Sequence, residues 1–171
     1  MLGAGGAARA VVTEMALAGA ADVLVVNRSV ERGEQMAAEL ARKTKAQIRF
    51  EAWRGPFRVP RDADLLVNAT SVGLYPDVDR MPPVDLSDAA ERLLVSDAVP
   101  NPPETALLKT ARRLGFPVLD GLAMLVHPGR HRLSHVDGDG GAGSGDERGL
   151  AAGVRTLTGS DPRKPVPSTG A

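Results

Sequence analysis

The stretch Gly3-Ala4-Gly5-Gly6-Ala7-Ala8 says more about the fold than any other part of the sequence. It fits the pattern G-x-G-x-x-A, in which the first glycine permits a tight turn and the second lets the backbone approach a pyrophosphate. The apolar pair Met1–Leu2 precedes it, and an Ala-rich helix is expected over residues 7–17 after it. The pattern favours a strand, turn and helix whose free N–H groups face a phosphate, against a plain glycine-rich turn as the alternative.

The next hundred residues alternate between apolar β-branched runs and longer stretches with helical spacing. Apolar strands separated by helices are typical of a parallel sheet covered on both sides. The sequence therefore predicts an α/β fold, a Rossmann-type doubly wound parallel sheet with helices on both faces and a truncated first strand. The expected strands are 22–27, 47–50, 64–68, 93–96 and 116–119, and the expected helices are 30–42, 104–114 and one that begins at Leu122.

Composition limits the possible classes of protein. The 171 residues include 21 basic and 21 acidic side chains, and this balance argues against a nucleic-acid partner. There is no cysteine, no apolar run long enough to cross a membrane and no signal-like N-terminus, so we expect a cytoplasmic location. Large apolar side chains become sparse after Pro128, which predicts a folded domain over residues 1–127 and a disordered or non-native tail over residues 128–171.

Three histidines, His127, His131 and His135, lie four residues apart and could be helical metal ligands. Pro128 and Gly129 lie within that run and oppose a helix through it. We therefore expect no metal site.

Two arginines follow the strand expected at residues 22–27. An NAD-binding domain usually has an acidic residue at this point, which accepts a hydrogen bond from the ribose 2′-hydroxyl. This chain has Asn27-Arg28-Ser29 there, with Arg32 one helical turn later. A guanidinium group suits a 2′-phosphate, so the sequence favours NADP over NAD; solvated arginines at a helix start are the alternative.

The stretch Asn68-Ala-Thr-Ser-Val-Gly73 follows the strand expected at residues 64–68. It falls at the carboxyl end of a parallel strand, where such sheets bind their ligands. Small polar residues there, including Thr70 and Ser71, would let a flat ring approach the backbone. Asn68, Thr70 and Ser71 are therefore candidate cofactor-binding residues, and an ordinary loop is the alternative.

Five stretches in order resemble the NADP-binding domain of the shikimate dehydrogenase family. The resemblance covers residues 1–127, and it implies NADPH-dependent reduction of 3-dehydroshikimate to shikimate in aromatic amino-acid biosynthesis. The matching stretches are GAGGAARA (3–10), NRSVER (27–32), NATSVG (68–73), the DAV-NPPET-LL segment (97–108) and DGLAML (120–125).

The resemblance also implies a role for individual residues. The pyrophosphate would lie on Gly3, Ala4, Gly5, Gly6 and Ala7, and the adenosine 2′-phosphate on Asn27, Arg28, Ser29 and Arg32. The nicotinamide would lie near Ala98, Gly121 and Met124.

The chain also departs from the family. Family members have a preceding domain that binds shikimate and supplies a catalytic Lys–Asp pair, and no residue here matches either, so no catalytic residue is assigned. Asp97 belongs to another motif and is not given that role. Pro100 and Pro128 stand where the family usually has a tyrosine and a substrate-binding glutamine. Shikimate or 3-dehydroshikimate would bind only with the missing N-terminal domain, and shikimate and quinate remain open as substrates.

Both ends of the chain carry expectations of their own. Met1–Leu2 is expected to be the remnant of a strand of about five residues, which predicts marginal stability and a start within a longer gene or a miscalled start. The resemblance stops at His127, and a one-base shift of the reading frame would explain the tail that follows. A stand-alone NADP-binding module, or an inactive remnant without catalysis, is the alternative function.

Overall fold

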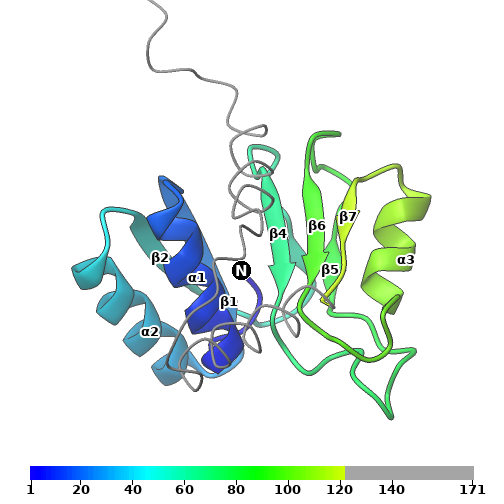
Figure 1. The fold of residues 1–171 in the computed structure, drawn as a ribbon, viewed down its shortest axis with the longest axis horizontal. Helices are drawn as coiled ribbons and strands as arrows, with labels where there is room; N and C mark the ends of the chain where they lie inside the picture. The colour runs from blue at the N-terminus through cyan, green and yellow to red at the C-terminus, as the bar shows by residue number, and fades with distance from the viewer. Residues whose placement is uncertain (122–171) are drawn as a thin grey trace, which may run out of the picture. The chain divides into compact units, whose positions relative to one another are not determined.

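The computed structural model describes residues 1–121, and it consists of parallel strands and helices (Figure 1). The helix expected from Leu122, the tail, Met124 and the three histidines lie outside the described residues. No helix within residues 1–121 is long and apolar enough to cross a membrane. In chain order the elements are α1 Gly6–Leu17, β1 Asp22–Asn27, α2 Val30–Lys43, β2 Gln47–Ala52, β3 Phe57–Arg58, β4 Leu65–Asn68, β5 Val84–Asp85, β6 Leu94–Asp97, α3 Ala106–Arg113 and β7 Val118–Leu119.

One residue joins two groups of strands into a single ladder. β1 pairs with β2, and β4 pairs with β6, which pairs with β7, all in parallel. Leu2 forms parallel bridges to Val26 at the end of β1 and to Asn68 at the end of β4. Its N–H donates to the Val67 carbonyl at 2.8 Å, and its carbonyl accepts from the Ala69 N–H at 2.9 Å. The order is therefore β2-β1-Leu2-β4-β6-β7.

Two apolar cores lie on the two faces of this ladder. Successive residues of β1 alternate between them, because Val25 belongs to one core and Val26 to the other. Helices α1 and α2 contribute Val12, Met36 and Leu40 to the core that holds Val25. Helix α3 contributes Leu107, Leu108 and Ala111 to the core that holds Val26. The expected arrangement, with helices on both faces of a parallel sheet, is confirmed.

The structure differs from the sequence-based expectation in the smaller elements. β3 and β5 form a separate two-stranded parallel sheet that was not predicted, because two residues are too few to show a periodic pattern. The helix expected over 104–114 begins at Ala106, since the Thr105 side chain caps it by accepting from the Leu108 N–H at 3.4 Å. β2 continues to Ala52, two residues beyond the predicted end.

Met1 is buried despite carrying the N-terminal ammonium group. It is 8% exposed, and its nitrogen donates to the Leu24 carbonyl at 2.8 Å. Burial lowers the pKa of this amine from 8.0 to about 6, because the charged form loses its hydration. Met1 and Leu2 thus have strand-like partners on both sides, and the expected marginal stability remains a prediction.

We predict that the buried amine makes stability depend on pH. Between pH 6 and 8 the unfolded chain binds more protons at this amine than the folded chain does, so the free energy of unfolding rises with pH. The difference between the two pKa values corresponds to an increase of about 2 kcal/mol in the free energy of unfolding between pH 6 and pH 8. Chemical denaturation at both pH values measures it.

The matched control is the same chain with an acetylated N-terminus. Acetylation removes the titrating group and keeps an N–H donor for the Leu24 carbonyl, while the histidines are unchanged. In the acetylated chain the free energy of unfolding should no longer show this increase with pH. An equal pH dependence in both chains would contradict the assignment of the effect to the Met1 amine.

Candidate functional site

The turn before α1 has room only for glycine at its first position. Gly3 has φ +102°, and a Cβ there would lie 2.9 Å from the Ala69 carbonyl oxygen and 3.2 Å from Thr70 Cγ2. The Gly3 N–H donates to the Val26 carbonyl at 2.8 Å. The glycine turn therefore packs directly against the loop over 68–73, and two stretches singled out from the sequence lie together.

The start of α1 leaves its backbone N–H groups open. Gly5 is the N-cap in an extended conformation, no side chain caps the helix, and its first turn has no acidic residue. Gly5, Gly6 and Ala7 are exposed, and a Cβ at Gly5 or Gly6 would meet no atom within 4 Å. Free N–H groups and the positive end of the helix dipole suit an anion at this position.

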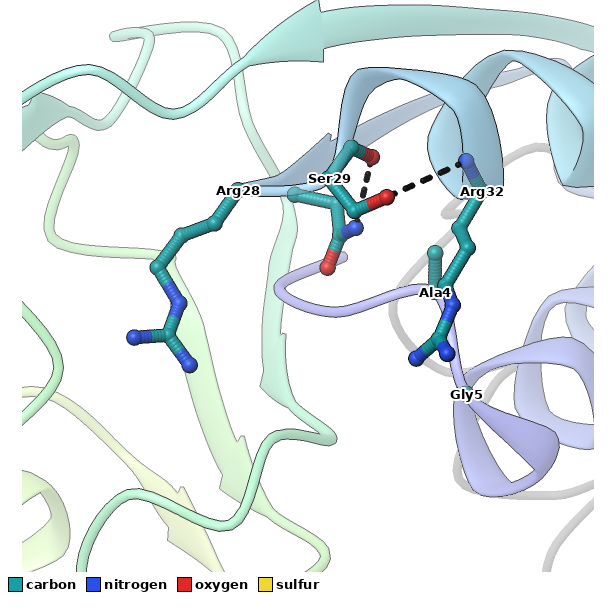
Figure 2. Close-up of a pocket in the computed structure, with 6 residues that line it drawn as sticks. Ala4, Gly5, Arg28, Ser29 and Arg32 are labelled. Atoms are coloured by element: carbon teal, nitrogen blue, oxygen red, sulfur yellow. Dashed lines mark hydrogen bonds between the residues drawn. The ribbon is translucent and has the colours of Figure 1, made fainter.

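A pocket of about 430 Å³ connects this turn with the end of β1 (Figure 2). The local hydrogen bonds hold its wall, because Asn27 Nδ2 donates to the Ser29 carbonyl at 2.8 Å and Ser29 Oγ accepts from the Arg32 N–H at 3.4 Å. All six lining residues were predicted as cofactor-binding residues from the sequence: Ala4, Gly5, Asn27, Arg28, Ser29 and Arg32.

The pocket has a positive wall. Arg28 and Arg32 are exposed, and within residues 1–121 neither guanidinium group forms an ion pair. In Figure 2 the Arg32 side chain lies on the side of the Ala4–Gly5 turn, whereas Arg28 extends away from it. No carboxylate lines the pocket. The two guanidinium groups can bind one phosphate of a ligand, and the open helix N–H groups can bind another.

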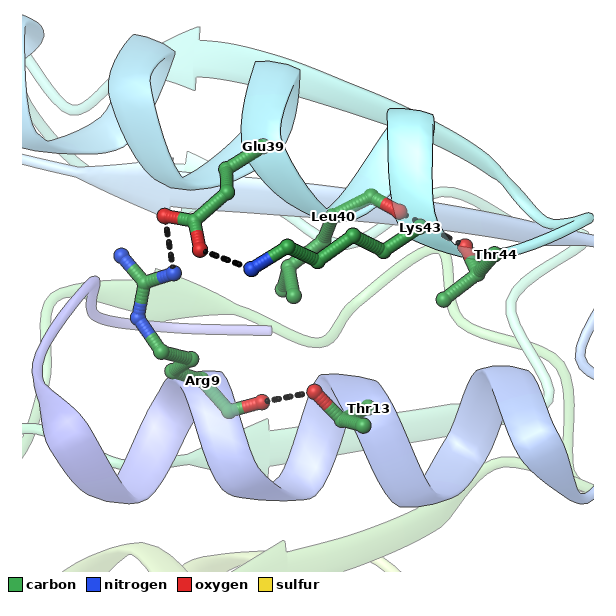
Figure 3. Close-up of polar contacts among 6 residues, drawn as sticks. All are labelled: Arg9, Thr13, Glu39, Leu40, Lys43 and Thr44. Carbon is green, nitrogen blue, oxygen red and sulfur yellow. Dashed lines mark hydrogen bonds and ion pairs between the residues drawn. The ribbon is translucent and has the colours of Figure 1, made fainter.

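Arg9 in α1 is close in sequence to the glycine turn, but its charge is already paired (Figure 3). Its guanidinium donates to Glu39 Oε2 on α2 at 2.5 Å, and Lys43 donates to Glu39 Oε1 at 2.6 Å. Hydrogen bonds from Lys43 and then Arg9 lower the pKa of the Glu39 carboxyl. This cluster holds α1 against α2, and Arg9 stays occupied away from the pocket.

A buried polar network lies at the carboxyl ends of β4 and β6. Asn68, Asp97 and Thr105 are each at most 1% exposed. Asn68 Nδ2 donates to Asp97 Oδ1 at 2.9 Å, and Thr105 Oγ1 donates to Asp97 Oδ2 at 2.7 Å. Asn68 Oδ1 accepts from the Thr70 hydroxyl at 2.7 Å. The network links the end of β4, the end of β6 and the cap of α3.

Asp97 acts in this network as an acceptor. Burial raises the pKa of its carboxyl, while hydrogen bonds from Thr105, the Val99 N–H and Asn68 oppose that rise. Both of its oxygens are occupied, so the side chain is suited to hold structure rather than to transfer a proton to a ligand. Sequence reasoning missed this network, although Asn68 and Asp97 end two buried strands and that shared position could have revealed it.

Of the residues expected beside a nicotinamide, Ala98 and Gly121 contact each other. A Cβ on Gly121 would lie 2.8 Å from the Ala98 carbonyl carbon and 2.8 Å from the Val99 oxygen, so the backbones touch at this point. Thr70 lies against Gly3, as described above, but the exposed Ser71 side chain is not among the residues that line the pocket. Met124 lies outside the described residues.

Comparison with known proteins connects this geometry to one family. The model of the family described as Shikimate / quinate 5-dehydrogenase matches residues 1–100. The curated shikimate dehydrogenase (NADP(+)) of Methanopyrus kandleri is 45% identical over 131 residues, which are 75% of this chain and 45% of that protein. The chain thus spans about half the length of the curated relatives that it matches.

Two solved structures have the same fold at substantial identity. The ligand-free 5-ketofructose reductase of a Gluconobacter species is 41% identical, with a TM-score of 0.75 over 91% of this chain and 55% of that chain. The shikimate 5-dehydrogenase of Thermus thermophilus, in complex with NADP(H) and shikimate, is 32% identical, with a TM-score of 0.64 over 91% of this chain and 53% of that chain.

We predict that Gly3→Ala lowers the free energy of unfolding by about 2 kcal/mol, because a methyl group there is strained and meets the Ala69 carbonyl. Gly6→Ala is the matched control in the same turn, since its Cβ meets nothing within 4 Å. It should change stability by less than about 0.5 kcal/mol. Equal stability losses in the two variants, measured by denaturant titration, would show that the close approach at Gly3 does not matter.

Proposed function

This chain belongs to the shikimate / quinate 5-dehydrogenase family, and we propose that it binds NADP(H) as the cofactor-binding half of a dehydrogenase of that family. The observation that carries the proposal is the pocket that the unpaired Arg28 and Arg32 line together with Ala4 and Gly5, at the open N-terminus of α1. Relatives described as NADP(+) enzymes, and a relative solved with NADP(H), support the choice of cofactor.

The described residues offer donors for the phosphate groups of this cofactor. The N–H groups of Gly5, Gly6 and Ala7 would hold the pyrophosphate, and Arg28 and Arg32 would hold the 2′-phosphate that distinguishes NADP from NAD. The nicotinamide would lie toward the loop 68–73 and the Ala98–Gly121 contact. When bound, the nicotinamide supplies a hydride donor or acceptor, and the chain's own residues bind and orient it.

The proposed reaction is the reduction of 3-dehydroshikimate to shikimate, by similarity to the curated relatives. The solved 5-ketofructose reductase leaves a different keto substrate open, since it is 41% identical to this chain, which covers 55% of it. By the family resemblance, the proton-transfer pair and most substrate contacts would come from a domain that precedes the NADP-binding domain.

A second candidate is a cofactor-binding module that does not itself catalyse. Asp97 is the one titratable side chain that is buried within residues 1–121. Its carboxylate oxygens accept hydrogen bonds from Asn68, Val99 and Thr105. That arrangement leaves the described part of the chain with no buried acid or base directed to a substrate.

We predict that Arg28→Ala weakens NADPH binding about ten- to a hundredfold, because a charge-assisted pair with the 2′-phosphate is lost. NADH binding should change by less than about twofold, since NADH has no phosphate at that position. Fluorescence titration of both ligands measures the difference. Arg42→Ala, at the far end of α2 and also exposed, is the control and should leave both affinities unchanged; equal loss of both ligands in Arg28→Ala would refute the assignment.

We also predict that the 171-residue chain does not oxidise shikimate with NADP⁺ although it binds NADPH. The reason is that no residue of the sequence matches the Lys–Asp pair that the family resemblance implies for proton transfer. A steady-state assay of NADPH formation tests this, with a full-length family member under the same conditions as the positive control. Turnover comparable to that control would overturn the prediction and favour a complete enzyme.

A further inference from the structure

A chain of buried hydrogen bonds runs from the start of α3 to the loop over 68–73. It begins at the Thr105 hydroxyl, passes through the Asp97 carboxylate to the Asn68 amide, and ends at Thr70. Thr70 Oγ1 in turn accepts from the Val72 N–H at 3.2 Å. This network therefore connects α3 and β6 to the loop 68–73 and fixes the backbone of that loop.

The members of this network have few alternative partners. Asp97 is fully buried, so an oxygen that loses its donor cannot turn to water without a change in structure. Thr105 is the side chain that contacts Asp97 Oδ2 at 2.7 Å. It also caps α3 through the Leu108 N–H, which fixes the hydroxyl relative to the helix. Removal of the hydroxyl would therefore loosen Asp97 and, through Asn68, the loop.

The loop that the network fixes contacts the cofactor site away from Arg28 and Arg32. Ala69 and Thr70 lie against Gly3 in the glycine turn, and Asp97 also accepts from the Val99 N–H beside the Ala98–Gly121 contact. The pocket with Arg28 and Arg32 receives no residue of the network. A change in the network should therefore affect the nicotinamide half of the site and spare the adenosine half.

From this placement we propose that Thr105 and Asp97 are positioning residues, which hold the loop 68–73 and the Ala98–Val99 turn in the conformation that receives the nicotinamide half of NADP(H). The inference rests on the proposed function and goes beyond it, because neither residue lines the pocket. A loop held before binding has less conformational freedom to lose when the ligand arrives, and so binds it more tightly.

The test compares two ligands on the intact chain by calorimetry. NADPH fills the whole site, whereas adenosine 2′,5′-bisphosphate fills only the half with Arg28 and Arg32. Thr105→Val keeps the shape of the side chain and removes the hydroxyl, and it should weaken NADPH about tenfold while changing the bisphosphate by less than about twofold. Thr105→Ser restores the hydroxyl and should bind NADPH within about threefold of the parent chain.

The outcomes separate the two proposals. If the parent chain does not bind the bisphosphate, the proposed function fails. If it does, and Thr105→Val weakens both ligands equally or neither, the network is not a positioning device for the nicotinamide half. A loss in Thr105→Ser as large as that in Thr105→Val would also overturn the inference.

A measurement on the parent chain keeps the inference open to refutation even if Thr105→Val does not fold. The Thr70 N–H donates to Asn68 Oδ1 at 3.1 Å, and the Val99 N–H donates to Asp97 Oδ1 at 3.0 Å. Hydrogen exchange of both amides, and of the Val72 amide, should be slow without ligand, because the network is already formed. Exchange at the rate of an open loop would contradict it.

Discussion

The backbone hydrogen bonds of Leu2 are the constraint on which the described fold depends. Leu2 occupies the position between β1 and β4, with its N–H on Val67 and its carbonyl on Ala69. Its side chain is fully buried in one core, while the neighbouring Met1 packs in the other. Gly3 follows immediately with a positive φ, so this pairing also sets the position of the turn and the direction of α1.

The site that results has two parts with different physical bases. The part at Arg28 and Arg32 depends on charge and on open backbone donors, and its groups are exposed and ready for a ligand. The part at Asn68, Asp97 and Thr105 depends on buried hydrogen bonds that are satisfied within the protein. A dinucleotide with a charged end and a flat, reactive end matches this division, since exposed charges select the phosphates and a fixed backbone can orient a ring.

Local sequence signals predicted the fold and the charged part of the site. The apolar run 22–27 matches β1 residue for residue, and Ser29 caps α2 where the expected helix begins. The six pocket residues were predicted because each belongs to a short motif next to a strand end. The buried network was not predicted: Asn68 and Asp97 each end a buried strand, but they are 29 residues apart, and their contact also requires β4 and β6 to be neighbours. β3 and β5 were missed because their pairing likewise depends on tertiary structure.

The phosphorus NMR spectrum of NADPH in the presence of the chain tests the central claim, a 2′-phosphate held by Arg28 and Arg32, most directly. Two guanidinium groups favour the doubly charged phosphate, so the 2′-phosphate resonance should shift on binding and its apparent pKa should fall. The pyrophosphate resonances should shift as well, because they lie at the start of α1. A 2′-phosphate whose resonance and titration are the same with and without the protein, while the pyrophosphate resonances move, would contradict the account.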